Sequence, residues 1–186
     1  QILVETGLVP GATGNPLLMC LARNKRVRNG ELLGTGFYNE NVYIKCEAPG
    51  RTAFTLDYTD STPEKVPAAH GEGRFTTTIP NLFEKLGENN QIVFRYCDQI
   101  GEADPNFPVN PNGAIDNAAA ICNPAGNVMA IMPHPERAFA IPMPKIFSSM
   151  RRYMENPSPQ TATLNITDNK PAIETYTVPG DTLQIF

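Results

Sequence analysis

The sequence predicts an α/β fold. Short apolar segments typical of strands are interspersed with segments that space their apolar residues as helices do. Hydrophobic residues make up 41% of the 186 residues without counting 14 glycines, which is enough to bury a core. The 18 prolines are about twice the average usage of roughly 5% and argue against a helical bundle or a long coiled coil.

The first half of the chain predicts helices and strands in mixed order. Residues 1–8 place apolar side chains on a partial helical face, which Gly7 and Pro10 end. Because a helix without a cap or a polar lead-in leaves its first N–H groups without partners, we expect the native chain to extend upstream of Gln1. Further along, the pattern predicts strands over residues 42–46, 75–79 and 91–97 and a short helix over residues 81–86.

The second half of the chain predicts a β-hairpin followed by helices. The hairpin is indicated by the turn residues Asn123-Pro-Ala-Gly126 between two apolar runs. Beyond Pro157, Pro, Thr, Asn and β-branched residues predict either two short strands or a partly mobile tail. The elements expected after residue 98 are, in order, a loop over 99–113, strands over 118–122 and 127–132, and helices over 136–140 and 145–154.

Composition and charge exclude several classes of function. A net charge of −4 lacks the basic surface of a general nucleic-acid binder. The longest uncharged run has 19 residues, but Pro, Gly and Asn interrupt it, so we expect no membrane span. No signal peptide is visible at the start. Four cysteines without a C-x-x-C pair predict neither a disulfide scaffold nor a zinc site, which favours a cytosolic protein.

A basic segment, RNKRVR at residues 23–28, carries four positive charges in six positions. Such a run is typical of a solvated face, with a contact to a phosphate or a partner as the alternative.

The most informative motif is the sequence Pro133-His134-Pro135-Glu136 after the second hairpin strand. A proline disfavours the helical region for the residue before it, so we expect His134 to be extended, and residues i and i+2 of extended backbone share a face. A carboxylate beside an imidazole can accept the Nδ1–H and fix the tautomer. The pair therefore predicts a general base with its orienting group. The alternative is a surface His beside a helix N-terminal Glu that favours the helix dipole.

Two further clusters are candidate site segments. Ala69-His70-Gly71-Glu72-Gly73 allows a close backbone approach, as required where main-chain groups hold a substrate's carboxylate or amino group. A tight turn before the next strand explains it equally well. Asn110-Pro-Asn-Gly113 is interpreted as a turn only. With only His70 and His134 as histidines, no metal site is expected.

Together these motifs resemble a known family. The segments HGEGRF (70–75), NPNGAIDNAAAICNPAGNVMAIMPHPERA (110–138) and QILVETGLVPGA (1–12) resemble the glutaminase subunit or domain of phosphoribosylformylglycinamidine synthase, a purine-biosynthesis enzyme. The resemblance covers most of residues 1–155 and implies a triad glutamine amidotransferase domain over 1–156, followed by an extension of unknown role over 157–186.

The implied fold is a flavodoxin-like α/β class I (triad) glutamine amidotransferase fold, here N-terminally incomplete. The family's nucleophile elbow has the pattern G-x-C-N-G-x-Q-x-L, and Gln1-Ile2-Leu3 matches its last three positions. The resemblance therefore places the nucleophilic Cys four residues before Gln1, outside this chain, and implies that the chain alone is inactive. The cysteines present, at positions 20, 46, 97 and 122, are expected to be small buried or half-buried residues.

The resemblance also implies a Cys-His-Glu triad. His134 would activate the thiolate and Glu136 would orient His134, while Gln1 and the turn His70-Gly71-Glu72 would contact the bound glutamine. No cofactor or metal is expected in this chain, because ATP and Mg²⁺ serve the synthetase partner that receives the ammonia. A small bridging subunit is a further expected partner.

Two alternatives remain at this point. A non-catalytic docking module with a degenerate triad fold would carry no Cys at the elbow position. An unrelated α/β hydrolase-like domain is disfavoured because the chain has no G-x-S-x-G motif.

Overall fold

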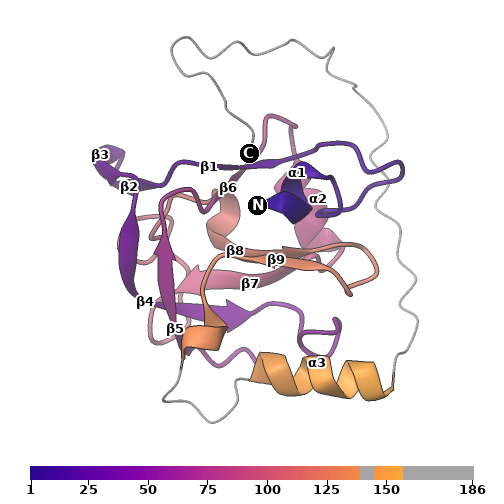
Figure 1. The fold of residues 1–186 in the computed structure, drawn as a ribbon. Helices are drawn as coiled ribbons and strands as arrows, with labels where there is room; N and C mark the ends of the chain where they lie inside the picture. Colours follow the sequence, from indigo (N-terminus) through magenta and orange to yellow (C-terminus); the bar gives the residue numbers. More distant parts are fainter. Residues whose placement is uncertain (139–144, 157–186) are drawn as a thin grey trace.

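A five-stranded sheet forms the centre of the structure, a computed structural model that describes residues 1–138 and 145–156. Its strand order is β5-β4-β7-β8-β9, and every neighbouring pair is antiparallel (Figure 1). These strands are β4 (Tyr38–Cys46), β5 (Glu64–His70), β7 (Ile92–Cys97), β8 (Ala118–Cys122) and β9 (Met129–Ile131).

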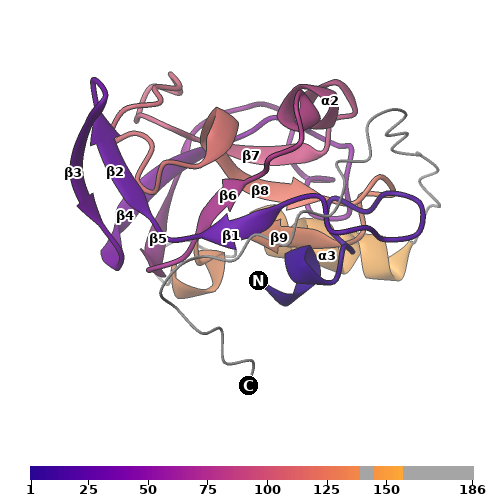
Figure 2. The ribbon, with the colours of Figure 1, turned by 90° about the horizontal axis from the view of Figure 1, so that it is seen from above.

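Two small two-stranded sheets accompany the central one. Strand β1 (Cys20–Ala22) pairs with β6 (Arg74–Thr76), and β2 (Lys25–Arg28) pairs with β3 (Glu31–Thr35). The β2–β3 connection is Asn29-Gly30, both at positive φ, as a two-residue type I′ hairpin turn requires. This hairpin stands at one end of the molecule (Figure 2).

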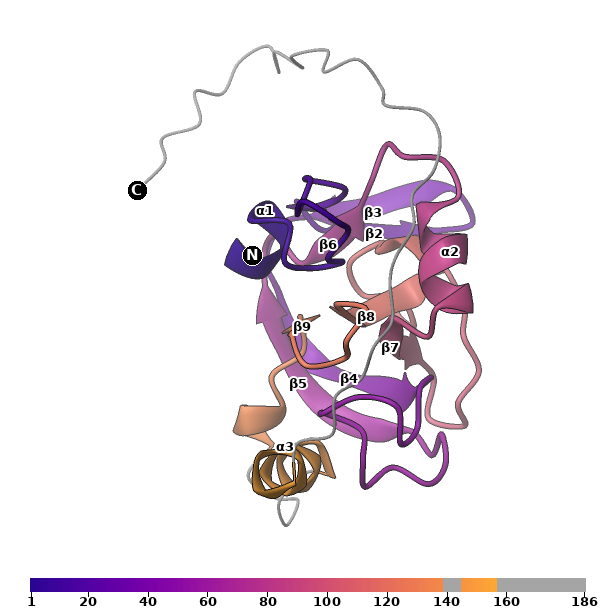
Figure 3. The ribbon, with the colours of Figure 1, turned by 90° about the vertical axis from the view of Figure 1, so that its right-hand side faces the viewer.

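The helices of the described residues are short. They are α1 (Ile2–Glu5), α2 (Leu82–Glu88) and α3 (Lys145–Glu155). Helix α3 lies beside the connection between β4 and β5 (Figure 3), where the Ser149 hydroxyl accepts a hydrogen bond from the Asp57 N–H at 2.9 Å. The side chains of Ile146 and Ser149 are buried there.

The parallel, flavodoxin-like sheet expected from the resemblance is not formed by the described residues. Parallel neighbours require a crossover of a dozen or more residues, usually a helix. Here β8 and β9 are joined by residues 123–128, which is too short, and α2 connects strands of different sheets. The described part of the chain is therefore a mostly antiparallel domain with few helices.

Most of the individual elements that the sequence predicts are present. The strands expected over 42–46 and 91–97, the 118–132 hairpin and the helix over 145–154 are confirmed, and the 81–86 helix runs from Leu82 to Glu88. The helix expected over 1–8 is limited to Ile2–Glu5, and the strand over 75–79 to Arg74–Thr76. The helix expected over 136–140 is wrong within the described residues, where a 3-10 turn spans Pro135–Arg137. The prediction for 157–186 lies outside the described residues.

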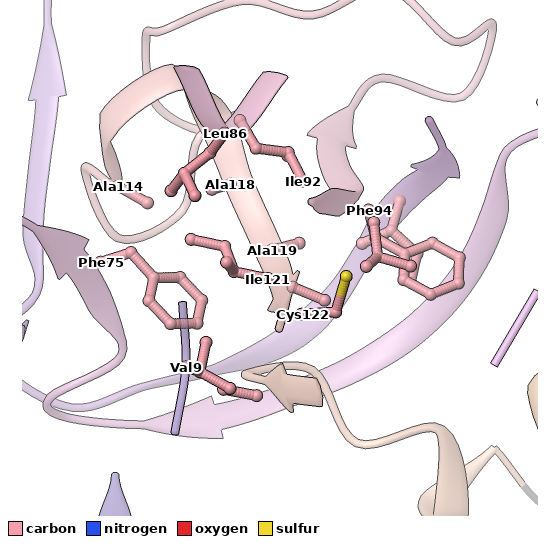
Figure 4. Packing of buried hydrophobic residues seen from close by; sticks show 14 of the residues in the cluster. Val9, Phe75, Leu86, Ile92, Phe94, Ala114, Ala118, Ala119, Ile121 and Cys122 are labelled. Carbon is pink, nitrogen blue, oxygen red and sulfur yellow. The ribbon is translucent and has the colours of Figure 1, made fainter. Parts of the chain in front are cut away.

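The core is built around β8. None of its five residues, AAAIC, has exposed surface, so both of its faces are covered. Phe75 and Phe94 lie on either side of β8 in Figure 4, and both belong to the same buried cluster. Phe94 also makes an edge contact with Tyr58, their ring centroids 5.5 Å apart. The small alanines of β8 allow these larger side chains to approach the sheet closely.

Candidate functional site

The structure brings His134 and Glu136 into direct contact. The His134 Nδ1 lies 2.7 Å from Glu136 Oε1, and the two side chains are 27% and 55% exposed. The sequence predicted that the two residues share one face of extended backbone. Glu136 instead belongs to the 3-10 turn over Pro135–Arg137. A carboxylate accepts hydrogen bonds, so in the neutral imidazole Nδ1 carries the proton and Nε2 keeps its lone pair. This is the tautomer that a general base at Nε2 requires.

The backbone holds His134 at the end of β9. Prolines at 133 and 135 restrict the chain on both sides of it, and His134 has φ −110° and ψ 79°. Its N–H donates to the carbonyl oxygen of Pro67 in β5 at 2.7 Å. The main chain of His134 is therefore attached to the central sheet. The same hydrogen bond brings β5 next to the 3-10 turn.

The second candidate cluster begins where β5 ends. His70 is the last residue of β5, Gly71 is half-buried, Glu72 is exposed and Gly73 is buried in the turn that leads into β6. The His70 ring packs directly over Gly73, where any Cβ would overlap the imidazole. Gly73 is therefore required by the position of this ring.

His70 and His134 lie close enough to interact electrostatically. Burial, with a smaller contribution from the charge of His134, lowers the pKa of His70 to about 4. The His70 Nε2 is buried and has no hydrogen-bond partner within the described residues. The sequence motifs around 70 and 134, which are far apart along the chain, thus form one region of the molecule.

Gln1 does not join this region within the described residues. Its side-chain amide donates to Glu5 Oε1 at 2.7 Å on the exposed surface of α1. The N-terminus and α1 lie near β1 and β9 rather than at the 3-10 turn (Figure 1). The substrate contact expected of Gln1 stays a prediction.

Two buried asparagines that the sequence interpretation missed stabilise the 71–73 turn. Asn24 contacts it from the β1–β2 connection, and the Asn112 amide donates to the Gly73 carbonyl oxygen at 2.8 Å. Asn112 in turn accepts the Lys25 N–H at 3.0 Å. The motif Asn110-Pro-Asn-Gly113, interpreted as a turn only, is thus a support of the candidate site.

The cysteines fall into two groups. Cys46, Cys97 and Cys122 are buried as expected, and burial raises their pKa to about 12, 11 and 12 respectively. The expectation of burial is wrong for Cys20, which is exposed because β1 pairs only with β6 and belongs to a two-stranded sheet. Partial burial raises the pKa of the Cys20 thiol as well. None of the four forms a hydrogen bond to His134 among the described residues.

A separate cavity of about 510 Å³ lies between β2 and the loop before β8. Its polar lining groups are occupied: Arg95 pairs with Glu47 and Asp116, at 2.8 and 2.6 Å. Within residues 1–138 and 145–156, no group of three or more His, Cys, Asp or Glu residues could hold a metal ion. No helix of this part of the chain is long and apolar enough to cross a membrane.

Comparison with known proteins gives consistent matches. A family model described as a CobB/CobQ-like glutamine amidotransferase domain matches residues 1–162. The phosphoribosylformylglycinamidine synthase subunit PurQ of Methanothrix thermoacetophila is 39% identical over 171 residues, or 83% of this chain and 64% of that protein. PurQ of Thermosynechococcus vestitus is 41% identical over 138 residues, or 74% of this chain and 49% of that protein.

A solved structure, described as PurLQS from Thermotoga maritima, superposes with a TM-score of 0.54 at 28% identity. The match covers 83% of this chain and 57% of that one. The chain thus spans about half to two thirds of the length of these relatives.

Proposed function

Because the chain belongs to the CobB/CobQ-like glutamine amidotransferase domain family, we propose that it is part of a glutamine-hydrolysing subunit of phosphoribosylformylglycinamidine synthase. The observation that carries this proposal is the His134–Glu136 contact of 2.7 Å, held at the end of β9 by the Pro67 carbonyl. The similarity to PurQ proteins supports the choice of synthase.

In this proposal the nucleophile is a Cys thiolate on the segment preceding Gln1. The thiolate attacks the side-chain amide carbon of glutamine, and backbone N–H groups at the elbow stabilise the oxyanion. His134 Nε2 takes the thiol proton and passes it to the leaving ammonia, so the C–N bond breaks as the thioester forms. His134 then removes a proton from water, whose oxygen displaces the thiolate and releases glutamate. Glu136 keeps Nδ1 protonated and stabilises the imidazolium.

The three buried cysteines of this chain suit the role of nucleophile poorly, and the exposed Cys20 has no hydrogen bond to His134 among the described residues, which favours an upstream Cys. Burial opposes ionisation of Cys46, Cys97 and Cys122, and a thiol reacts as its thiolate. Upstream strands would also supply the parallel, flavodoxin-like part of the sheet. They would pair with β9, which is an edge strand of the central sheet among the described residues and lies next to α1.

Glutamine would bind beside the 70–73 turn. The turn lies in the same region as His134, and Gly71 permits a close approach of a ligand to the backbone. Within the described residues no hydrogen bond uses the N–H of Glu72, which leaves it available to a substrate carboxylate. Gln1 would reach the site after its amide leaves Glu5.

The ammonia product would pass to a synthetase partner that uses ATP and Mg²⁺. The similarity to a chain of the PurLQS structure supports such a partner and a small bridging subunit. No cofactor is proposed for this chain, and neither nucleic acid nor membrane is proposed as a partner. The second candidate function is a non-catalytic docking module with a degenerate triad, and the identity of the residue at the elbow position decides between the two.

Glutaminase activity of the full-length subunit with its synthetase tests the proposal. His134→Ala should lower kcat by about a thousandfold or more, as removal of a triad base does elsewhere, and Glu136→Gln should cause a smaller loss. Glu155→Gln is the matched control, because it neutralises an exposed carboxylate paired with Arg151 on α3. The chain of residues 1–186 alone should be inactive. Full activity of His134→Ala would contradict the proposal, and lack of a Cys at the elbow would favour the docking module.

A further inference from the structure

Asn24 is a fully buried residue between β1 and β2 whose side chain reaches the turn of the candidate site. Its amide donates to the His70 carbonyl oxygen at 2.7 Å and accepts the Gly73 N–H at 2.9 Å. Its own backbone N–H donates to the Gly71 carbonyl oxygen at 2.9 Å. Asn24 thus forms hydrogen bonds to His70, Gly71 and Gly73, across the whole turn.

The orientation of the Asn24 amide follows from these partners. A carbonyl oxygen only accepts and a backbone N–H only donates, so the amide nitrogen must face His70 and the amide oxygen must face Gly73. Both the nitrogen and the oxygen of this buried amide therefore have a hydrogen-bond partner. Its removal would therefore take away the side-chain partner of the part-buried His70 carbonyl oxygen and of the buried Gly73 N–H, which is costly.

The imidazole of His70 is part of the same arrangement. Its Nδ1 lies 3.2 Å from Asn24 Nδ2 and 3.3 Å from Oδ1, and the ring lies over Gly73. A shift of Asn24 would therefore move the ring and the turn together. The groups that Asn24 engages do not include the Glu72 N–H, which forms no hydrogen bond within the described residues.

We infer that Asn24 is a positioning residue for glutamine binding, which acts by holding the 70–73 turn in the conformation that presents the Glu72 N–H to the substrate. This inference rests on the proposed function and extends it to a residue that does not touch the substrate. Because Asn24 acts on the binding turn and has no hydrogen bond to His134 or Glu136, its loss should affect the KM for glutamine more than kcat.

The test compares two buried amides in the full-length subunit with its synthetase partner. Asn24→Ala removes both hydrogen bonds of the side chain to the turn. Gln91→Ala is the matched control: Gln91 is also fully buried and donates to two carbonyl oxygens, of Pro10 and Cys122, at 2.8 Å each. Thermal unfolding midpoints are measured first, and glutaminase kinetics are then recorded well below both midpoints.

We expect Asn24→Ala to raise the KM for glutamine roughly tenfold, with kcat within about threefold of the wild type. Gln91→Ala should leave KM within about twofold of the wild type, even if it lowers the thermal unfolding midpoint as much as Asn24→Ala does. If Asn24→Ala does not fold, Asn24→Ser, whose single hydroxyl lies one bond closer to the backbone than the amide atoms and replaces their hydrogen bonds only in part, should show the same KM effect at smaller size.

An unchanged KM in folded Asn24 variants would overturn the inference, as would an equal rise in Gln91→Ala. These outcomes are distinct from failure of the proposed function, in which the wild-type complex would show no glutaminase activity or His134→Ala would retain it.

Discussion

Replacement of His70 should change how the stability of the protein depends on pH. The folded state holds His70 neutral, with a pKa of about 4 against an ordinary value of 6.5, chiefly because the ring is buried. Between these two pH values the unfolded chain binds a proton at this residue that the folded chain does not. Stability rises with pH wherever the unfolded state binds more protons. The free energy of unfolding therefore decreases through His70 as the pH falls from about 6.5 toward 4, and this loss is constant at lower pH.

The size of the effect follows from the pKa difference. One pKa unit corresponds to about 1.4 kcal/mol, so the shift from 6.5 to about 4 amounts to about 3 kcal/mol when complete. Integrating the linkage relation, about 2 kcal/mol of this loss falls between pH 7 and pH 5. This interval lies above the usual titration range of carboxylates, so their contribution to it is small.

Urea unfolding of wild type and His70→Gln at pH 7 and pH 5 measures this quantity. His70→Gln should lose about 2 kcal/mol less stability than wild type over the interval, whatever the variant costs at pH 7. The difference between the two pH values cancels any constant loss of packing. NMR titration of the His70 ring in the wild type gives an independent measurement. Equal pH dependence in both proteins, or a His70 midpoint near 6.5, would refute the reasoning.

Three further predictions concern packing and thiol chemistry. Gly73→Ala should destabilise the fold by more than about 1 kcal/mol, because its Cβ would overlap the His70 imidazole. Gly87→Ala, in the open last turn of α2, should stabilise the fold by up to about 1 kcal/mol. Urea unfolding of both variants measures the two changes. Phe94→Ala should cost about 3–5 kcal/mol and Phe37→Ala, 69% exposed, under about 0.5 kcal/mol, and equal losses would contradict the core described above. Cys20 should react first with a thiol reagent at pH 8, whereas rapid labelling of the three buried cysteines in the native state would be inconsistent with their burial.

Local patterns predicted those parts of the fold that depend on neighbouring residues. The 118–132 hairpin was predicted because turn residues and apolar runs adjoin. The His134–Glu136 contact was predicted from the spacing of the two residues, although the backbone that forms it is a 3-10 turn and not extended. The β2–β3 hairpin was missed although Asn29-Gly30 is a strong signal for a two-residue hairpin turn. Its first strand lies in the 23–28 segment, whose charges indicated only a solvated face or a partner contact.

The remaining parts depend on contacts between distant residues. Asn24 contacts residues 46 to 49 positions away, and no local pattern marks an asparagine as the partner of a turn so far along the chain. The antiparallel order of the central sheet likewise depends on which strands pair, which alternation of apolar residues does not specify. The resemblance predicted the family correctly. The flavodoxin-like sheet that it also implied is not formed by residues 1–138 and 145–156.

The complete burial of β8 determines which part of the molecule opens last. Its amide hydrogens lie between two neighbouring strands and beneath side chains on both faces, so they can exchange with solvent only when most of the domain unfolds. The β2–β3 hairpin is two-stranded and largely exposed, and its hydrogen bonds can break while β8 stays closed. Among the described residues, a protease should therefore cleave first near Asn29-Gly30, and β8 should be among the last strands to be released.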